Sequence, residues 1–266
     1  MADLWFIGLG LGDERDVGPR ARDVLRESDR IFAEEYTAVW AIGALDRLSE
    51  EIGRPIERLG REEVESERPV LDALAQCERV VFLAVGDPFS ATTHLALRLA
   101  AARRGHRTHY LPNASILTAA AGFLGLMPYR FGRTVSIPLP DDRFRPTSFL
   151  ASIRSNWASD LHTLILLDLR PSEGTFLTAG EAIRILRERD RERATLPRGL
   201  EVAVVARVGS DSAAAWYGPI DELSGVDFGP PMHALVVPAR TLHFEEQAAI
   251  QLFRTPRDAG AAPAIP

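Results

Sequence analysis

The stretch "FLAVGDPFSATTH", from Phe82 to His94, combines a carboxylate, a rigid turn and several hydroxyl groups. Pro88 fixes its own φ angle and lacks a backbone donor, so the apolar run must stop there. Gly86 allows a backbone conformation that other residues resist. Asp87 is therefore expected at the carboxyl edge of a sheet, where open α/β folds bind ligands, and a carboxylate held in a rigid turn suits an amine or another cation. Thr92 and Thr93 are expected in the first turn of the next helix, either as caps or as ligand contacts.

A glycine loop, "GLGLGDERD", follows the first apolar run. Its spacing does not favour dinucleotide binding, because Asp13 stands where the third glycine of G-x-G-x-x-G would lie. An acidic loop would also repel a pyrophosphate at a helix N-terminus. A tight turn after a strand explains the glycines without explaining the acids.

Three further junctions place small or acidic residues after an apolar run. They are "PNASIL" with Ser115 and Ile116, "LILLDLR" with Asp168, and "ARVGSDS" with Val208, Gly209 and Ser210. Each could be an ordinary loop. Four such strand ends in one chain together indicate a ligand-binding edge.

Several kinds of chemistry are disfavoured by what the chain lacks. All 31 basic residues are arginine, which excludes a lysine Schiff base, a pyridoxal-phosphate anchor and a P-loop lysine. The six histidines show no metal-ligand spacing, and His94, His162 and His243 are expected to be packing or surface residues. No Gly-x-Ser-x-Gly elbow indicates a serine hydrolase. We therefore expect no metal site and assign no catalytic side chain.

The composition is ordinary for a soluble globular protein, and a single cysteine fits the cytoplasmic location that we expect. The formal net charge is -6 and no dense basic block occurs, so nucleic-acid binding is not expected. No apolar run approaches the roughly 20 residues of a membrane helix, and no signal peptide is visible. The single cysteine, Cys77, cannot form an intrachain disulfide, and we expect it to be a small buried apolar residue.

Strands and helices alternate in the N-terminal half, which predicts a parallel sheet covered by helices on both faces. The expected strands are 4–12, 30–37, 79–85 and 107–112, and the expected helices are 19–29, 42–53, 62–77 with an interruption at Pro69, and 91–105. Prolines punctuate the chain after residue 111. The second half should contain strands at 161–170, 199–210 and 233–239, and helices at 178–193 with Thr178 as N-cap and at 241–253. We expect an N-terminal α/β domain at 1–111, a C-terminal α/β domain at 112–256 and a disordered tail at 257–266.

Seven motifs occur in order along the chain at a spacing that matches a known family. They are "FIGLGLGDERD", "FAEEYT", "GDPFSATTH", "NASI", "LHTLILLDL", "ARVGS" and "GPPMHALVVP". In these motifs, from Leu4 to about Phe253, the chain resembles the archaeal type of the diphthine synthase family, within the tetrapyrrole methylase superfamily. The Gly-Asp-Pro turn alone would indicate only the superfamily.

This resemblance implies an S-adenosylmethionine-dependent N-methyltransferase that is a homodimer, with two α/β domains and a cofactor cleft between them. S-adenosylhomocysteine is the expected product. The implied partner is translation elongation factor 2, whose 2-(3-amino-3-carboxypropyl)-histidine is methylated successively on its amino group to form diphthine. The resemblance places cofactor contacts at Leu11, Asp87, Ser90, Ser115, Ile116, Leu167, Val208 and His233. The contact at Ser90 is expected from its backbone, and Asp87 is expected to bind the cofactor's amino group while burying little surface of its own.

Two other functions remain open. A precorrin-type tetrapyrrole methyltransferase would use the same scaffold with a different acceptor, although the acidic "DERD" and "AEE" segments disfavour a substrate with many carboxylates. A non-catalytic module that binds elongation factor 2 would have no saturable affinity for S-adenosylmethionine.

Overall fold

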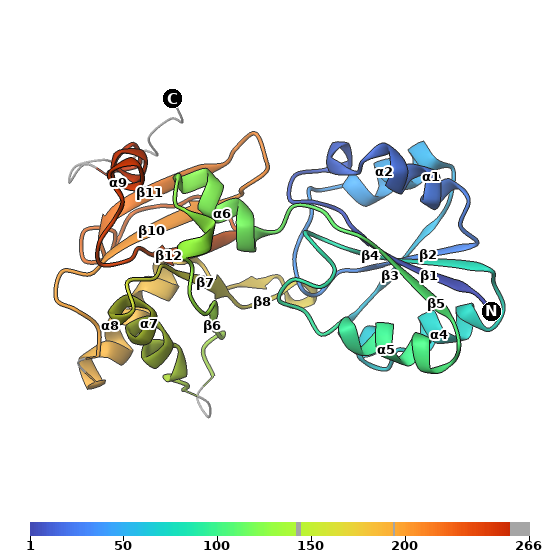
Figure 1. Cartoon of the computed structure of the whole chain (residues 1–266), viewed down its shortest axis with the longest axis horizontal. Coiled ribbons are helices and arrows are strands. Elements are labelled where there is room, and N and C mark those ends of the chain that lie inside the picture. The colour runs from blue at the N-terminus through green and yellow to red at the C-terminus, as the bar shows by residue number, and fades with distance from the viewer. Residues whose placement is uncertain (142–144, 194, 256–266) are drawn as a thin grey trace. The chain divides into compact units, whose positions relative to one another are not determined.

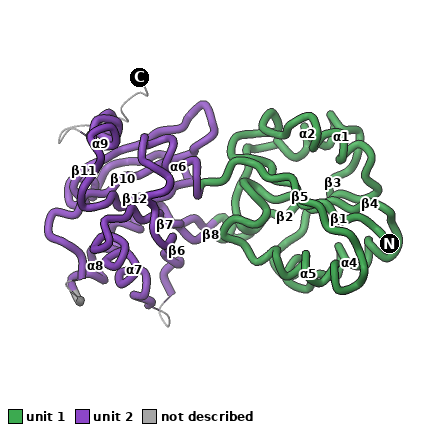
Figure 2. Tube along the Cα trace, in the orientation of Figure 1, with its two compact units in different colours: residues 1–116, 170–174 green, residues 117–169, 175–266 purple. Residues whose placement is uncertain are grey.

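The computed structural model describes residues 1–141, 145–193 and 195–255. The chain divides into two compact units, Met1–Ile116 with Arg170–Gly174, and Leu117–Leu169 with Thr175–Pro266 (Figure 2). The predicted tail at 257–266 lies outside the described residues. Each unit is considered by itself below.

The first unit is built on a five-stranded sheet in the order β3-β2-β4-β1-β5 (Figure 1). All neighbouring strands are parallel, which confirms the predicted sheet type. The strands are β1 (Asp3–Gly8), β2 (Arg30–Glu34), β3 (Ile56–Leu59), β4 (Arg79–Ala84) and β5 (Arg107–Leu111). The sequence did not predict β3, because this short edge strand leaves Glu57 and Arg58 exposed and shows no apolar run.

Helices cover both faces of this sheet, as predicted (Figure 1). One face packs against α1 (Pro19–Arg26) and α2 (Ala44–Ile52), and the other against α3 (Arg61–Glu65), α4 (Arg68–Leu74) and α5 (Leu95–Arg103). Alternate residues of each central strand face opposite ways. In β4, Val81 and Leu83 join the α1–α2 core, while Val80 and Phe82 join the other core.

The helix ends of the first unit follow the sequence signals closely. Pro19 is the first residue of α1, where its missing donor costs nothing. Gly53 closes α2 in the left-handed conformation, with φ at 67°. Pro69 lies in the first turn of α4, so the single helix expected at 62–77 is two helices, α3 and α4.

The second unit contains a mixed five-stranded sheet in the order β11-β10-β12-β7-β6. Only the β6–β7 pair within it is parallel. Its strands are β6 (Val135–Ile137), β7 (Thr163–Leu167), β10 (Glu201–Ala206), β11 (Ala214–Pro219) and β12 (His233–Val237). A separate two-stranded ribbon joins β8 (Leu169–Arg170) to β9 (Thr175–Phe176). The strand expected at 161–170 is therefore divided into β7 and β8 at Asp168.

Helices α7 (Ser148–Ala158) and α8 (Ala179–Arg193) lie on one face of the second sheet, and α6 (Ile116–Leu124) and α9 (Phe244–Gln251) on the other (Figure 1). Thr178 caps α8 as predicted: its hydroxyl accepts from the Glu181 N–H at 3.3 Å, and the Glu181 carboxylate accepts from the Thr178 N–H at 2.9 Å. Three short 3₁₀ turns complete the elements: η1 (Glu14–Asp16), η2 (Pro128–Arg130) and η3 (Pro171–Glu173).

None of the helices in the described part of the chain is long and apolar enough to cross a membrane.

Candidate active site

Three strand ends of the first unit meet at one edge of the parallel sheet. Strands β4, β1 and β5 are neighbours, so their carboxyl ends lie side by side. The loops after β1 and β4 bind each other through their backbones. Gly10 donates to the Gly86 oxygen at 3.2 Å, and Gly86 donates to the Gly10 oxygen at 2.8 Å. This pairing brings the glycine loop and the Gly-Asp-Pro turn together.

The glycines at this edge are required by close backbone contact. A Cβ on Gly8 would lie 2.5 Å from the Gly86 oxygen, which no side-chain adjustment could relieve. Gly10 and Gly86 have φ angles of 78° and 73°, in the left-handed region that favours glycine. The glycines thus serve the contact between two loops, which accounts for a spacing that does not fit a dinucleotide fingerprint.

The two aspartates of the "DERD" segment hold their own loop, whereas its Glu14 binds Arg47 of α2 at 2.8 Å. The Asp16 carboxylate accepts from the Gly12 N–H at 2.7 Å. Asp13 caps η1 by accepting from the Arg15 N–H at 3.0 Å. The Arg15 guanidinium also binds Asp13 and lowers the pKa of that carboxyl to about 2. These bonds explain the acids that a simple tight turn left unexplained.

Asp87 is anchored on three sides. Its Oδ1 accepts from the Phe89 N–H at 3.0 Å and from the Ser90 hydroxyl at 3.1 Å, and its Oδ2 accepts from the Tyr110 hydroxyl. Only 6% of the residue is exposed. The expectation that Asp87 buries little was wrong, because the turn folds back over its own carboxylate and β5 supplies a donor from the side.

The hydroxyl-rich segment after the turn holds the turn itself. Helix α5 begins at Leu95, so the prediction that Thr92 and Thr93 lie in its first turn was wrong. The Thr92 hydroxyl donates to the Pro88 oxygen at 2.9 Å, and the His94 Nδ1–H donates to the same oxygen at 2.9 Å. His94 is buried, as expected of a packing residue, and burial lowers its pKa so that it stays neutral.

The remaining predicted contacts of the first unit gather beside this turn. Ser115 is buried, and Ile116, the first residue of α6, is half-buried. A Cβ on Gly86 would lie 3.8 Å from Leu11 Cδ2 and 4.0 Å from Ser115 Cα. Leu11, Ser115 and the Gly86–Asp87 turn therefore belong to one cluster. Ser90 is also half-buried. Its hydroxyl donates to the Asp87 carboxylate, and its backbone N–H donates to the Asp87 backbone carbonyl oxygen at 3.2 Å.

Asn113 and Tyr110 support this cluster, and the sequence reasoning did not single them out. The Asn113 side chain donates to the backbone carbonyl oxygens of Gly8 at 3.0 Å and Asp16 at 3.1 Å. These two bonds connect the loop after β5 to the glycine loop. Asn113 lies inside the motif "NASI", so the motif contained a usable signal. No sequence signal indicated Tyr110, because its hydrogen bond to Asp87 depends on the order of the strands in the sheet.

The three predicted contacts of the second unit also share one edge of a sheet. His233 begins β12 and pairs with Ala206 at the end of β10, two residues before Val208. Ala234 pairs with Leu166, so Leu167 at the end of β7 lies at the level of His233. Leu167 and His233 are buried and Val208 is half-buried.

His233 combines one satisfied and one unsatisfied ring nitrogen. Its Nδ1 accepts from the Ala179 N–H at 3.2 Å, which leaves the proton on Nε2. Nε2 is buried and has no hydrogen-bond partner within the described part of the chain. Burial lowers the pKa of His233, and the nearby Arg207 cation lowers it further, so the ring is neutral. A buried donor without a partner is costly unless a ligand or water completes it.

The other singled-out residues of the second unit have structural partners. The Asp168 carboxylate accepts from the Leu139 N–H at 3.0 Å and the Leu169 N–H at 2.9 Å. The Ser210 hydroxyl donates to the Arg207 oxygen at 2.9 Å. Both residues hold loops at strand ends, which is the ordinary role that the sequence left open for them.

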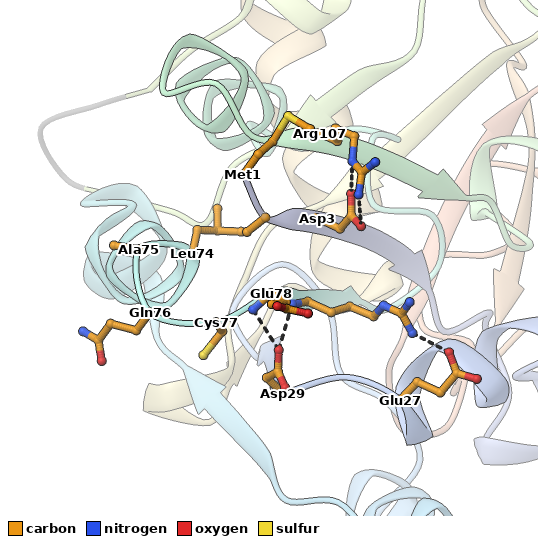
Figure 3. A pocket seen from close by; sticks show the side chains of 12 residues that line it. Met1, Asp3, Glu27, Asp29, Leu74, Ala75, Gln76, Cys77, Glu78 and Arg107 are labelled. Atoms are coloured by element: carbon orange, nitrogen blue, oxygen red, sulfur yellow. Dashed lines mark hydrogen bonds and ion pairs between the residues drawn. The ribbon is translucent and has the colours of Figure 1, made fainter.

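A separate hollow of about 580 Å³ lies at the opposite, amino edge of the first sheet (Figure 3). The carboxylates of Asp3 and Asp29 are engaged. Asp3 binds Arg107, and Asp29 accepts from the Glu78 and Arg79 N–H groups at 2.9 and 2.8 Å. Cys77 also lines it and is half-buried, whereas the sequence led us to expect a buried apolar residue. None of the predicted cofactor contacts lines this hollow.

Within the described residues, no group of three or more histidine, cysteine, aspartate or glutamate side chains is placed to hold a metal ion.

Comparison with known proteins shows the family to which this chain belongs. The profile of the tetrapyrrole (corrin/porphyrin) methylases matches residues 3–224, and this chain belongs to that family. Proteins named diphthine synthase match it over nearly their whole length. Those of Methanocorpusculum labreanum and Methanosphaerula palustris are 39% and 40% identical over 252 and 254 residues, each covering 94% of this chain and 98% of the relative. These relatives place the chain in the diphthine synthase branch, a group of methyltransferases.

Solved structures agree with this placement. The crystal structure of a putative diphthine synthase from Entamoeba histolytica superimposes with a TM-score of 0.87 at 31% identity, covering 96% of this chain and all of the other. A crystal structure titled diphthine synthase gives a TM-score of 0.86 at 33% identity, covering 95% and 96% of the two chains. The predicted two-part α/β fold of the tetrapyrrole methylase type is confirmed.

Proposed function

We propose that this chain uses S-adenosylmethionine to methylate translation elongation factor 2, in the formation of diphthamide. The acceptor is the amino group of a 2-(3-amino-3-carboxypropyl)-histidine, which is methylated successively to diphthine. Membership of the diphthine synthase branch supports the acceptor. The observation that carries the cofactor assignment is the convergence of β1, β4 and β5 on the buried Asp87 carboxylate.

The residues present fit this cofactor. Asp87 accepts three hydrogen bonds, and a carboxylate offers about four acceptor positions, so one remains for the cofactor's α-ammonium group. In the second unit, the Nε2–H of His233 has no partner among the described residues and is a donor suited to an acceptor atom of a ligand. Apolar side chains such as Leu11, Ile116 and Leu167 suit the cofactor's adenine ring and the methylene groups beside its sulfonium. The proposed contacts are Leu11, Asp87, Ser90, Ser115, Ile116, Leu167, Val208 and His233.

The chemistry asks the protein mainly for orientation. The bound cofactor would supply an activated methyl group on a sulfonium, so no nucleophilic side chain is required. The proposed contacts would hold the cofactor, so that the chain positions the acceptor amine against its methyl group. Because only a neutral amine has the necessary lone pair, each cycle also releases a proton, which solvent can take. We assign no side chain as catalytic base.

The proposed partners follow from the substrate. A translation factor places the enzyme in the cytoplasm, and neither nucleic acid nor a membrane is needed. We further propose a homodimer, as the family resemblance implies. Light scattering coupled to gel filtration should give twice the 29.3 kDa mass of one chain. A single-chain mass at micromolar concentration would contradict this proposal.

The decisive experiment uses elongation factor 2 that carries the extended histidine. Incubation with S-adenosylmethionine should add one, two and then three methyl groups to that residue, as seen by mass spectrometry of the modified peptide. Elongation factor 2 with an unextended histidine is the matched control and should gain none. Transfer to a precorrin instead would favour the tetrapyrrole alternative. Binding of elongation factor 2 without saturable affinity for S-adenosylmethionine would favour a non-catalytic module.

A further inference from the structure

The two oxygens of the Asp87 carboxylate have different surroundings. Oδ1 accepts from the Phe89 N–H and the Ser90 hydroxyl, both from the turn that contains Asp87. Oδ2 accepts from the Tyr110 hydroxyl, which comes from another strand. With about two acceptor positions on each oxygen, Oδ1 is fully used and Oδ2 keeps one. The position that a ligand can use is therefore on the oxygen that Tyr110 holds.

Tyr110 is well placed to fix that oxygen. It lies on the edge strand β5, opposite Phe6 of β1. Its ring packs on Phe89 with centroids 5.1 Å apart, and Phe89 packs on Phe6 at 4.9 Å. The phenol is thus supported by the core beneath it, yet 39% of the residue is exposed. Its hydroxyl can share Asp87 with a ligand that arrives from solvent.

We propose that Tyr110 is a positioning residue, which orients Asp87 Oδ2 so that its remaining acceptor position meets the α-ammonium group of the cofactor. This inference rests on the proposed function. It assigns the recognition of the amino-acid end of the cofactor to a pair, Asp87 and Tyr110. Without the phenol, Oδ2 loses its only bond among the described residues, and water competes for both of its acceptor positions.

The protonation state of the phenol supports this role. Burial and the hydrogen bond to Asp87 raise the pKa of Tyr110 to about 12. The hydroxyl therefore remains a donor throughout the pH range in which the enzyme can work. A phenylalanine at this position keeps the ring packing on Phe89 and removes only the donor, so the variant isolates the hydrogen bond.

The test compares Tyr110→Phe with the wild-type chain by calorimetric titration of two probes. S-adenosylhomocysteine carries the amino-acid portion, whereas methylthioadenosine lacks it. We expect Tyr110→Phe to weaken S-adenosylhomocysteine binding about tenfold and to change methylthioadenosine binding less than about twofold. Only the first probe has the ammonium group whose bond to Asp87 depends on the orientation that Tyr110 provides. Tyr129→Phe is the matched control. Tyr129 is 79% exposed, its hydroxyl lies 2.7 Å from Met127 Sδ, and its loss should affect neither probe.

The outcomes are distinguishable. Equal weakening of both probes would show that Tyr110 only supports the fold of the edge, and would overturn the inference. Unchanged binding of both probes by Tyr110→Phe would overturn it as well, while leaving the proposed function intact. A wild-type chain that binds neither probe would instead overturn the cofactor assignment, and the role of Tyr110 with it.

Discussion

Glu246 is a buried carboxylate of the second unit that accepts hydrogen bonds from four residues. Its Oε1 accepts from the Met127 N–H and the His162 Nε2–H, each at 2.9 Å, and its Oε2 accepts from the His243 N–H at 3.0 Å and from the Arg130 guanidinium. Burial acts to raise the pKa of Glu246, but these donors outweigh it and lower the pKa. The glutamate therefore fastens the start of α9 to η2 and β7 as an anion.

Removing this carboxylate should be costly. We expect Glu246→Ala to lower the free energy of unfolding by about 3–5 kcal/mol, because three donors lose this acceptor in a buried site and Arg130 keeps only Asp160 as a carboxylate partner. Urea denaturation gives the measurement. The neighbouring Glu245→Ala is the control. The Glu245 side chain is 69% exposed, so its loss should change stability by less than about 0.5 kcal/mol. Equal effects of the two substitutions would contradict this role for Glu246.

The buried histidines predict a pH dependence of stability. Burial lowers the pKa of His94, His162 and His233 below the ordinary value of 6.5. Below pH 6.5 the unfolded chain binds protons at these positions that the folded chain does not, so stability must fall as the pH falls. Each histidine contributes a slope of up to about 1.4 kcal/mol per pH unit. Urea denaturation between pH 7.5 and 5 should show this decline, and a flat profile would contradict it.

The candidate site of the first unit depends on two loops whose glycine backbones are in direct contact. The Gly10–Gly86 pair closes the edge above β1 and β4, and Gly8 lies directly beneath it. Asn113 adds a third loop. The loops thus form an edge that is held by backbone contact, and the turn that carries Asp87 is part of it.

This dependence can be tested with a single methyl group. Gly8→Ala should destabilise the chain by about 1–3 kcal/mol, since the new Cβ meets the Gly86 oxygen at 2.5 Å. Gly122→Ala is the matched control in α6, where nothing lies within 4 Å of the added Cβ. There the better helix propensity of alanine should stabilise by up to about 1 kcal/mol. Thermal denaturation measures both, and a tolerated Gly8→Ala would contradict the close contact.

The elements that could be predicted were those with strong local signals. The buried strands β1, β2 and β4 show apolar runs, whereas the edge strand β5 is marked by Gly105 before it and Pro112 after it. Pro19, Gly53 and Thr178 mark helix ends. The elements that were missed lack such signals. Strand β3 is short with exposed residues, and β6 has only three residues. Strand β11 and helix α7 were also missed, because β11 contains glycine and proline and α7 follows a proline-rich stretch.

At the scale of the whole molecule, the two units have separate hydrophobic cores. The first sheet packs into one core on each face, and the α7–α8 face of the second sheet forms a third. Gly8 and Glu246 lie in different units and share no hydrogen-bond partner in the described structure. Their substitutions should therefore act independently.

Hydrogen exchange can test this independence. In Gly8→Ala, amide protection should fall in residues 1–116 and remain nearly unchanged in the second unit. Glu246→Ala should show the reverse. The free-energy changes of the two substitutions should add in the double variant to within about 0.5 kcal/mol. Loss of protection across both units in either single variant would contradict the separation.

The residues of the candidate site that could be predicted are those that lie at strand ends or inside the family motifs. The resemblance gave residues that the structure gathers at one sheet edge in each unit, Leu11, Asp87 and Ser115 in the first and Leu167, Val208 and His233 in the second. It could not give Tyr110, whose bond to Asp87 requires β5 to lie beside β1. Nor could it give the burial of Asp87, which depends on how the turn folds back.

A crystal structure of the protein with S-adenosylhomocysteine would test the central claim most directly. We predict that the amino-acid portion of the ligand binds at the carboxyl edge of the first sheet, with its ammonium group within hydrogen-bond distance of Asp87 Oδ2. Ligand density at the amino edge, beside Asp3 and Arg107, or on a surface away from Leu11, Asp87 and Ser115 would contradict the account.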